Sequence, residues 1–280
     1  MKEDSDLQLS IIVPVYNVEK YIRACIESIF KQRLDENTFE VIIVNDGTQD
    51  RSMEVIQDII DQHKNITVIN QENQGLSMAR NNGMAIARGE YILMPDSDDL
   101  LVENSLKPLL KKALETKVDL VVADFLTMND DEINNRQLIY QQEFSMKEKT
   151  GEKLYMDDFK PNQSYVWRTL YKKDFITKNN LKFIPGIYFQ DVPFTHEAYL
   201  KAKTCIKTSW LLNIYRRGQE SASNLSTFNL KKAHDFCIAI AKSWELYKKI
   251  WKDFYLKQKR NKNTQYMFRT TTYYIVYYSN

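Results

Sequence analysis

Three aspartates within four residues form the part of this sequence with the clearest chemical meaning. Asp96, Asp98 and Asp99 directly follow an apolar segment, residues 91–95. Carboxylates this close raise one another's pKa and resist joint ionisation unless a cation lies between them. Mg²⁺ and Mn²⁺ prefer oxygen ligands, and Mg²⁺ is often held by one or two carboxylates together with substrate phosphates. The cluster therefore indicates a site for a nucleoside diphosphate and a divalent metal, with a solvated acidic loop at a helix start as the alternative.

Short apolar segments alternate with helical patterns around this cluster. Strands are expected at 9–17, 39–44, 66–69, 91–95 and 120–123, and helices at 21–30, 53–60, 75–87 and 106–114. This alternation predicts an α/β fold with a mostly parallel, Rossmann-like central sheet that helices cover on both faces. Right-handed crossovers place the carboxyl ends of parallel strands at one edge, where open α/β sheets bind ligands. Asn17, Asp46 and the aspartates follow such ends, so we expect them to share one crevice.

Four segments resemble those of the family 2 glycosyltransferases, which have the GT-A fold. They are residues 10–17 (SIIVPVYN), 44–50 (VNDGTQD), 73–83 (NQGLSMARNNG) and 89–99 (GEYILMPDSDD), in the family's order and at its usual spacing. The resemblance covers about the first 125 residues. It implies a UDP-sugar site in which Asp46 hydrogen-bonds the uracil and Asp98 binds the metal that bridges the diphosphate. Asp96 would support the metal or the ribose.

Further residues of these segments are expected donor contacts. Pro14, Tyr16 and Asn17 belong to the first segment. Ser77 and Arg80 lie three residues apart on a predicted helix, so both side chains can emerge on one face. A fixed guanidinium suits a diphosphate. For Arg80 the alternative is a side chain that snorkels along a surface helix.

A second group of candidates lies on the acceptor side. Gln190 and Asp191 stand where the family shows Glu-Asp, and the resemblance makes Asp191 the general base. A carboxylate near the acceptor hydroxyl can accept its proton in an inverting displacement, whereas Gln190 can only orient by hydrogen bonds. The alternative for Asp191 is the N-cap of a helix at 193–201. Trp167 lies in a segment similar to the family's Trp-Asn-Lys-Leu-Tyr, and its ring either stacks on an acceptor sugar or packs in the core.

Composition agrees with an intracellular enzyme. The chain has 280 residues, of which 43% are hydrophobic, enough for one large α/β core. The glycine patterns of dinucleotide-binding and P-loop proteins are absent, and a net charge of +2 does not suggest a nucleic-acid partner. The three cysteines are scattered singly, so reduced thiols in apolar surroundings are expected. The sequence shows neither a leader peptide nor an apolar run of about 18 residues, so a cytoplasmic location is expected.

The organisation predicted from these patterns has three parts. Residues 1–125 form a nucleotide-sugar-binding half, 126–215 the acceptor-side part of the same GT-A domain, and 216–280 a helical C-terminal region that ends in an uncapped apolar run. Within the second part, 129–135 and 141–153 are polar and predict an excursion loop.

The C-terminal region carries an amphipathic pattern. Its aromatic stripe among lysines consists of Trp244, Tyr247, Trp251 and Phe254. A basic helix with such a stripe suits the anionic face of a membrane, so peripheral membrane contact through residues 244–262, at the inner face of the cytoplasmic membrane, is one hypothesis. Packing of the stripe on the catalytic domain, with the lysines solvated, is the other.

These observations predict a metal-dependent, inverting glycosyltransferase. It would use Mn²⁺ or Mg²⁺ and transfer a hexose from a UDP-sugar to a carbohydrate or lipid-linked glycan, in bacterial surface polysaccharide synthesis. Asn45, where many relatives carry a second acid, and Gln190 keep open a non-catalytic nucleotide-sugar or glycan-binding module. A sugar nucleotidyltransferase is the less favoured enzyme, because the first strand lacks the Gly-rich loop with Arg that normally follows it there.

Overall fold

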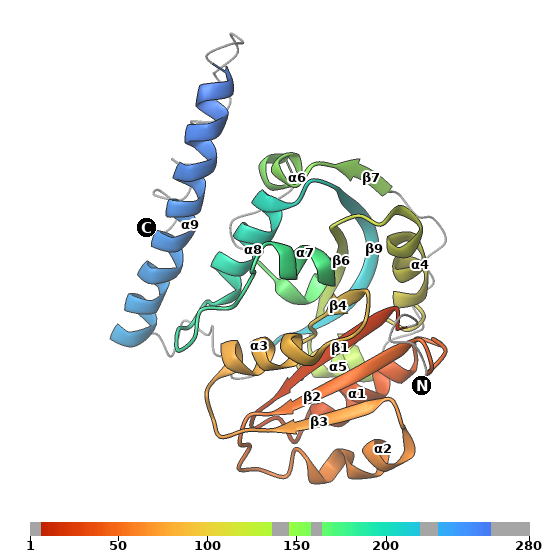
Figure 1. Ribbon diagram of the computed structural model, residues 1–280. Helices are drawn as coiled ribbons and strands as arrows, with labels where there is room; N and C mark the ends of the chain where they lie inside the picture. Colours follow the sequence, from red (N-terminus) through yellow and green to blue (C-terminus); the bar gives the residue numbers. More distant parts are fainter. Residues whose placement is uncertain (1–6, 136–145, 158–163, 219–228, 259–280) are drawn as a thin grey trace.

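The computed structural model describes residues 7–135, 146–157, 164–218 and 229–258, the last ten of them by backbone alone. In these residues nine strands form one sheet, in the order β3-β2-β1-β4-β8-β6-β9-β5, with β7 paired to β9. Helices lie on both sides of the sheet (Figure 1). The structure is the α/β architecture expected from the alternating pattern.

The first four strands are parallel. β1 (Leu9–Val15) pairs with β2 (Phe39–Asn45) on one side and β4 (Tyr91–Leu93) on the other, and β2 pairs with β3 (Ile66–Asn70). Successive residues of β1 point to opposite faces of the sheet. Ile11 packs in the same core cluster as α1 (Ile22–Phe30) and α4 (Leu106–Thr116), whereas Ile12 packs with α3 (Leu76–Ile86) in another. Both faces of β1 are covered, which explains its continuous apolar sequence.

The strands beyond β4 pair in both directions, so the expected parallel sheet describes only its first half. β8 (Thr169–Lys172) runs antiparallel to β4 and to β6 (Leu120–Met128). β6 is parallel to β9 (Cys205–Arg216), which pairs antiparallel with β5 (Leu100–Leu101) and β7 (Met146–Lys149). Of these strands the sequence pattern predicted only β6, and an apolar run does not reveal the direction in which a strand pairs.

The remaining elements lie between these strands in the sequence, except α9, which follows the last of them. They are η1 (Glu54–Ile56), α2 (Gln57–Gln62), α5 (Asp130–Asn134), α6 (Gly151–Asp157), η2 (Val166–Arg168), α7 (Lys173–Lys178), α8 (Asp191–Lys201) and α9 (Leu230–Gln258). Cys25 and Cys205 are buried and free as expected, but Cys237 is free and exposed.

The polar excursion contains secondary structure that its composition did not predict. The Asn129 side chain accepts a hydrogen bond from Glu132 N (2.9 Å), and the Glu132 carboxylate accepts one from Asn129 N (2.7 Å). This reciprocal capping box starts α5. Further along, β7 and α6 occupy most of 146–157, while residues 136–145 lie outside the described residues. The expectation of a simple loop was therefore wrong for most of this segment.

The C-terminal region is helical, as predicted. α9 lies beside α8 and extends away from the sheet (Figure 1). Trp244 is 41% exposed and stacks on Tyr247, with ring centres 5.6 Å apart. The side chains of Trp251 and Phe254, and residues 259–262 of the proposed membrane segment, lie outside the described part. Among the described helices, none combines the length and apolar character needed to span a membrane.

Candidate functional site

Hydrogen bonds between polar residues join the loop after β1 to the loop after β2. Asn17 adopts a left-handed conformation with φ 53°, which asparagine tolerates better than most residues. Its backbone N donates to Thr48 Oγ1 (2.8 Å), and its side-chain oxygen accepts from Gln49 N (3.1 Å). Tyr16 beside it is 43% exposed. Pro14 lies in β1 beyond the residues that pair with β4. Its lack of a backbone N–H therefore costs no hydrogen bond to β4.

Asp46 is buried and fixes the entry into α3. Its side chain is 3% exposed and accepts from Gln71 Nε2 (2.7 Å), Gln74 N (2.8 Å) and Gly75 N (2.9 Å). Gly75, with φ 83°, precedes the first helical residue. A carboxylate offers about four acceptor positions, so these three bonds leave room for one further donor.

Arg80 is a core residue and not a surface side chain. It is 1% exposed, as is expected for the inner face of α3 that also buries Ser77. One terminal nitrogen pairs with the Asp96 carboxylate, and the guanidinium carbon lies 5.3 Å from the centre of the Phe183 ring. The Nε and Nη1 atoms are buried without a protein partner. Since buried donors are normally paired, these two nitrogens need an acceptor that the described protein atoms do not supply.

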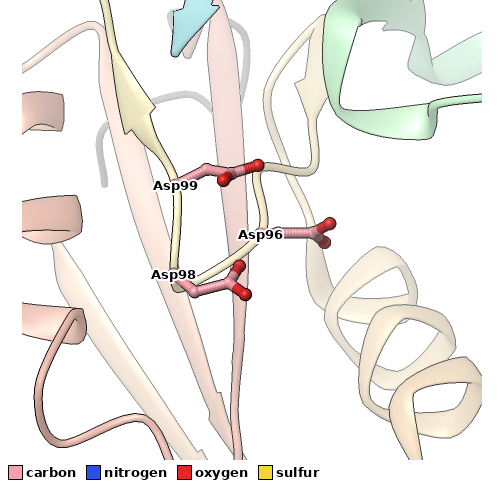
Figure 2. A group of neighbouring side chains, drawn as sticks. All are labelled: Asp96, Asp98 and Asp99. Atoms are coloured by element: carbon pink, nitrogen blue, oxygen red, sulfur yellow. The ribbon is translucent and has the colours of Figure 1, made fainter. Parts of the chain in front are cut away.

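The three aspartates gather at the end of β4, and Figure 2 shows Asp96, Asp98 and Asp99 projecting to one side of their loop. One oxygen from each lies within 4.8 Å of the others. Asp99 is 1% exposed, and its Oδ2 is buried without a hydrogen-bond partner. Burial, followed by the charges of Asp98 and Asp96, raises the pKa of Asp99 well above its usual value. An orphaned carboxylate oxygen in an all-oxygen cluster fits a hard divalent cation.

Arg216, at the end of β9, was not identified from the sequence. Its Nε donates to Asp98 O (2.9 Å), and its backbone N donates to Asp99 Oδ1 (2.8 Å). The guanidinium carbon lies 4.8 Å from the centre of the Tyr21 ring, and Nη1 pairs with Asp130. Arg216 therefore holds the aspartate loop through hydrogen bonds to Asp98 and Asp99. No local sequence signal reveals this role, because it depends on how β9 crosses the sheet.

Asp191 lies close enough to the aspartate loop to interact with it electrostatically. It is half-buried, and burial raises its pKa to about 6. The Arg80 charge acts to lower this pKa and the Asp96 charge to raise it. Asp191 is the first residue of α8 and not its N-cap, which is Gln190. The Gln190 side chain makes no capping bond; it is 6% exposed, with Oε1 buried and without a hydrogen-bond partner.

Trp167 packs in the protein interior, which was one of the two interpretations of its sequence segment. It is 2% exposed and stacks on Tyr165 and Tyr215, with ring centres 4.8 and 5.9 Å away. Its face is therefore covered, and an acceptor sugar approaching this cluster would meet the partly exposed tyrosines first. Stacking of a sugar directly on Trp167 does not agree with this burial.

Fold and site together define a GT-A type α/β protein. Residues 10–175 match the model of Glycosyl transferase family 2, and the chain belongs to this family. It is 36% identical over 81% of its length to a Bacillus subtilis protein described as the uncharacterized glycosyltransferase EpsJ, and 32% identical over 84% to the glycosyltransferase GlyG of Streptococcus pneumoniae. The chain spans 65% of the first relative and 78% of the second.

Solved structures show the same fold. The TarS 1–349 structure from S. aureus in complex with UDP-GlcNAc superimposes with a TM-score of 0.67 at 22% identity, covering 84% of this chain and 66% of that one. A mannosyltransferase from Pyrobaculum calidifontis, in complex with GDP-Man and Mn²⁺, gives 0.61 at 14% identity, covering 86% and 66%. At such identities the likeness concerns the fold alone.

Proposed function

We propose that this chain is a metal-dependent, inverting glycosyltransferase that transfers a hexose from a UDP-sugar to a glycan or lipid-linked glycan during cell-surface polysaccharide synthesis. One observation carries the proposal. In a family 2 fold, Asp96 of the cluster Asp96, Asp98 and Asp99 pairs with a buried Arg80 that has two unpartnered nitrogens, and the charges of Arg80 and Asp96 act on Asp191. The UDP-GlcNAc complex of TarS and the name of a 28% identical relative, the poly(ribitol-phosphate) beta-glucosyltransferase of Bacillus spizizenii, support the donor and acceptor classes.

On the donor side, Asp98 and Asp96 would hold Mn²⁺ or Mg²⁺, and the more deeply buried Asp99 lies next to them. A bound divalent cation supplies charge neutralisation for a leaving diphosphate. The free Nε and Nη1 of Arg80 would donate to a phosphate oxygen, since guanidinium geometry suits that partner. Asp46 has one acceptor position left for the uracil. Its three existing bonds hold it in place for that contact.

On the acceptor side, Asp191 would accept the proton of the attacking hydroxyl. A base is most effective when its pKa lies near the working pH, and a value of about 6 for Asp191 meets that condition better than an exposed aspartate would. Gln190 would orient the acceptor through its buried side-chain amide. We further propose that this reaction takes place at the inner face of the cytoplasmic membrane, which residues 244–262 would contact from the cytoplasm.

Titration of UDP into the protein by calorimetry, with Mn²⁺ and with a chelator, tests the donor site. We expect UDP to bind much more weakly without metal, because the aspartate cluster then repels the diphosphate. Asp98→Ala should remove the metal-dependent increment, whereas Asp174→Ala, an exposed aspartate paired with Lys178, should bind as the parent does. Equal affinity with and without chelator would refute the metal assignment.

Turnover separates an enzyme from a binding module. Hydrolysis of UDP-GlcNAc, in which water takes the place of the glycan acceptor and UDP is released, should be measurable for the parent protein, and a non-catalytic module would show none. Asp191→Asn keeps the size of the side chain but removes the proton acceptor, so turnover should fall by about 10² to 10⁴ while the affinity for UDP with Mn²⁺ stays nearly unchanged. Loss of both together would show that Asp191 is structural.

A further inference from the structure

The segment that carries Asp191 is anchored at both ends by distant parts of the chain. We call residues 183–191 the base loop. At its start, Asn81 of α3 donates to Phe183 O and accepts from Phe183 N, both at 2.9 Å. Arg80, the preceding residue, pairs with Asp96 and lies over the Phe183 ring. The first anchor therefore ties the base loop to the donor side.

The end of the base loop contains a backbone conformation that needs support. Phe189, two residues before Asp191, has φ 58°, in the left-handed region that bulky side chains rarely adopt. Such residues persist where surrounding contacts over-determine them, and they concentrate at functional sites. Val192 N donates to Phe189 O (3.1 Å), so this conformation directly precedes the first turn of α8.

The contacts that support this conformation come from α9. Tyr188 N donates to Asp235 Oδ2 (3.1 Å), across 47 residues of sequence. Lys231 Nζ donates both to the same Asp235 oxygen (2.6 Å) and to Gly186 O (3.2 Å). The Asp235 side chain is only 6% exposed. One buried carboxylate and one ammonium thus bind a backbone donor and a backbone acceptor of the base loop.

Aromatic contacts reinforce the same attachment. The Lys231 and Lys232 ammonium groups lie 4.8 and 5.4 Å from the centre of the Tyr188 ring. The Phe189 ring meets Phe236 edge-on, with centres 5.3 Å apart. Hydrogen bonds, cation–π contacts and ring packing therefore all join the first two turns of α9 to the two residues that precede Gln190.

We infer that Asp235 of α9 is a positioning residue for Asp191: by binding the Tyr188 amide it holds the base loop so that the carboxylate faces the acceptor side of the crevice. The inference rests on the proposed function, because it takes Asp191 as the general base. It makes α9 part of the catalytic apparatus and not only an appendage to the GT-A domain. A catalytic group must be held within a fraction of an ångström, and a displacement of about 1 Å can cost on the order of 10²-fold in rate.

Three variants test the inference. Asp235→Ala removes the acceptor, Asp235→Asn keeps an acceptor oxygen of the same size, and Glu245→Ala alters an exposed residue of the same helix, paired with Lys242, that does not touch the base loop. Hydrogen–deuterium exchange of residues 184–190 reads the loop directly, and UDP release from UDP-GlcNAc with Mn²⁺ reads catalysis. Thermal melting shows that each variant is folded at the assay temperature.

We expect Asp235→Ala to speed exchange at the Tyr188 amide by roughly tenfold or more, since a hydrogen bond to a charged acceptor is lost. Its kcat should fall by about 10- to 100-fold with KM for UDP-GlcNAc within about twofold. Asp235→Asn should recover most of both properties, and Glu245→Ala should match the parent. Unchanged exchange and kcat in Asp235→Ala would overturn the inference. It would also be overturned if Asp235→Asn lost as much kcat and as much melting temperature as Asp235→Ala.

The two proposals fail in different ways. If Asp191→Asn keeps normal turnover, or the parent releases no UDP from any UDP-sugar, the proposed base or function is wrong. The exchange measurement then still decides whether Asp235 holds the loop. If Asp191→Asn is inactive while Asp235→Ala behaves as the parent in exchange and turnover, only the role of Asp235 is wrong.

Discussion

Replacing Asp46 by asparagine tests whether this carboxylate supports the fold as well as the donor. Its Oδ1 accepts from Gln71 Nε2 and Gln74 N, and its Oδ2 accepts from Gly75 N. An asparagine side chain has one oxygen, so it can keep at most the two bonds of one side. Its amide group then faces the remaining backbone N–H, donor against donor.

The size of the effect follows from these contacts. Losing one bond to a charged acceptor costs about 1.5–3 kcal/mol, and removing a negative charge at the start of α3 costs about 0.3–1 kcal/mol. Gln74 is exposed and Gly75 half-buried, so water recovers part of this. We expect Asp46→Asn to lower the free energy of unfolding by about 1–3 kcal/mol.

Urea denaturation at pH 7 measures this difference. Asp131→Asn is the matched control, because Asp131 is an exposed aspartate in the first turn of α5 and carries the helix-end charge effect. It should change the free energy of unfolding by no more than about 1 kcal/mol. A loss below about 1 kcal/mol for Asp46→Asn would refute the reasoning and leave Asp46 with a binding role alone. Calorimetry with UDP and Mn²⁺, at a temperature where both proteins are folded, then tests the proposed uracil contact separately.

Two further predictions concern pH and packing. The base role proposed for Asp191 requires a deprotonated carboxylate, so UDP release should fall as pH drops through about 6, where an aspartate of ordinary pKa would stay active to about pH 4. Arg80→Met should move the midpoint to higher pH, since the Arg80 charge lowers this pKa; a midpoint that stays in place would contradict the coupling. A Cβ on Gly89 would lie 2.3 Å from the Leu9 backbone carbon, so Gly89→Ala should destabilise the protein by about 1–3 kcal/mol in urea, whereas an unchanged midpoint would show that β1 can shift.

The gathering of the aspartates could be predicted because their position follows from local rules. Asp46 and the three aspartates each follow a strand, and parallel strands share one carboxyl edge. The same reasoning placed Ser77 and Arg80 on one face of α3, although it did not show that this face is buried. Burial is a property of the packed layers, and an arginine in a short polar motif gives no sign of it.

The supporting half could not be predicted because it depends on tertiary placement. Arg216 reaches the aspartate loop only because β9 crosses the sheet beside β6, and Asp235 reaches Tyr188 only because α9 packs along α8. Both residues lie in stretches whose periodicity indicates a strand or a helix and nothing more. β8 itself was not predicted, because the short segment Thr169–Lys172 has no apolar run that would indicate a strand.

The placement of β8 bears on how this protein can be made or divided. β8, at residues 169–172, lies between β4 and β6, which are complete long before it in the chain. A growing or truncated chain that stops before Thr169 therefore leaves the facing edges of β4 and β6 unpaired, and β6 lacks its other neighbour β9 as well. Open edges invite pairing with other chains. We therefore expect a chain that ends before β8 to associate through these edges, because the strands that cover them lie later in the sequence.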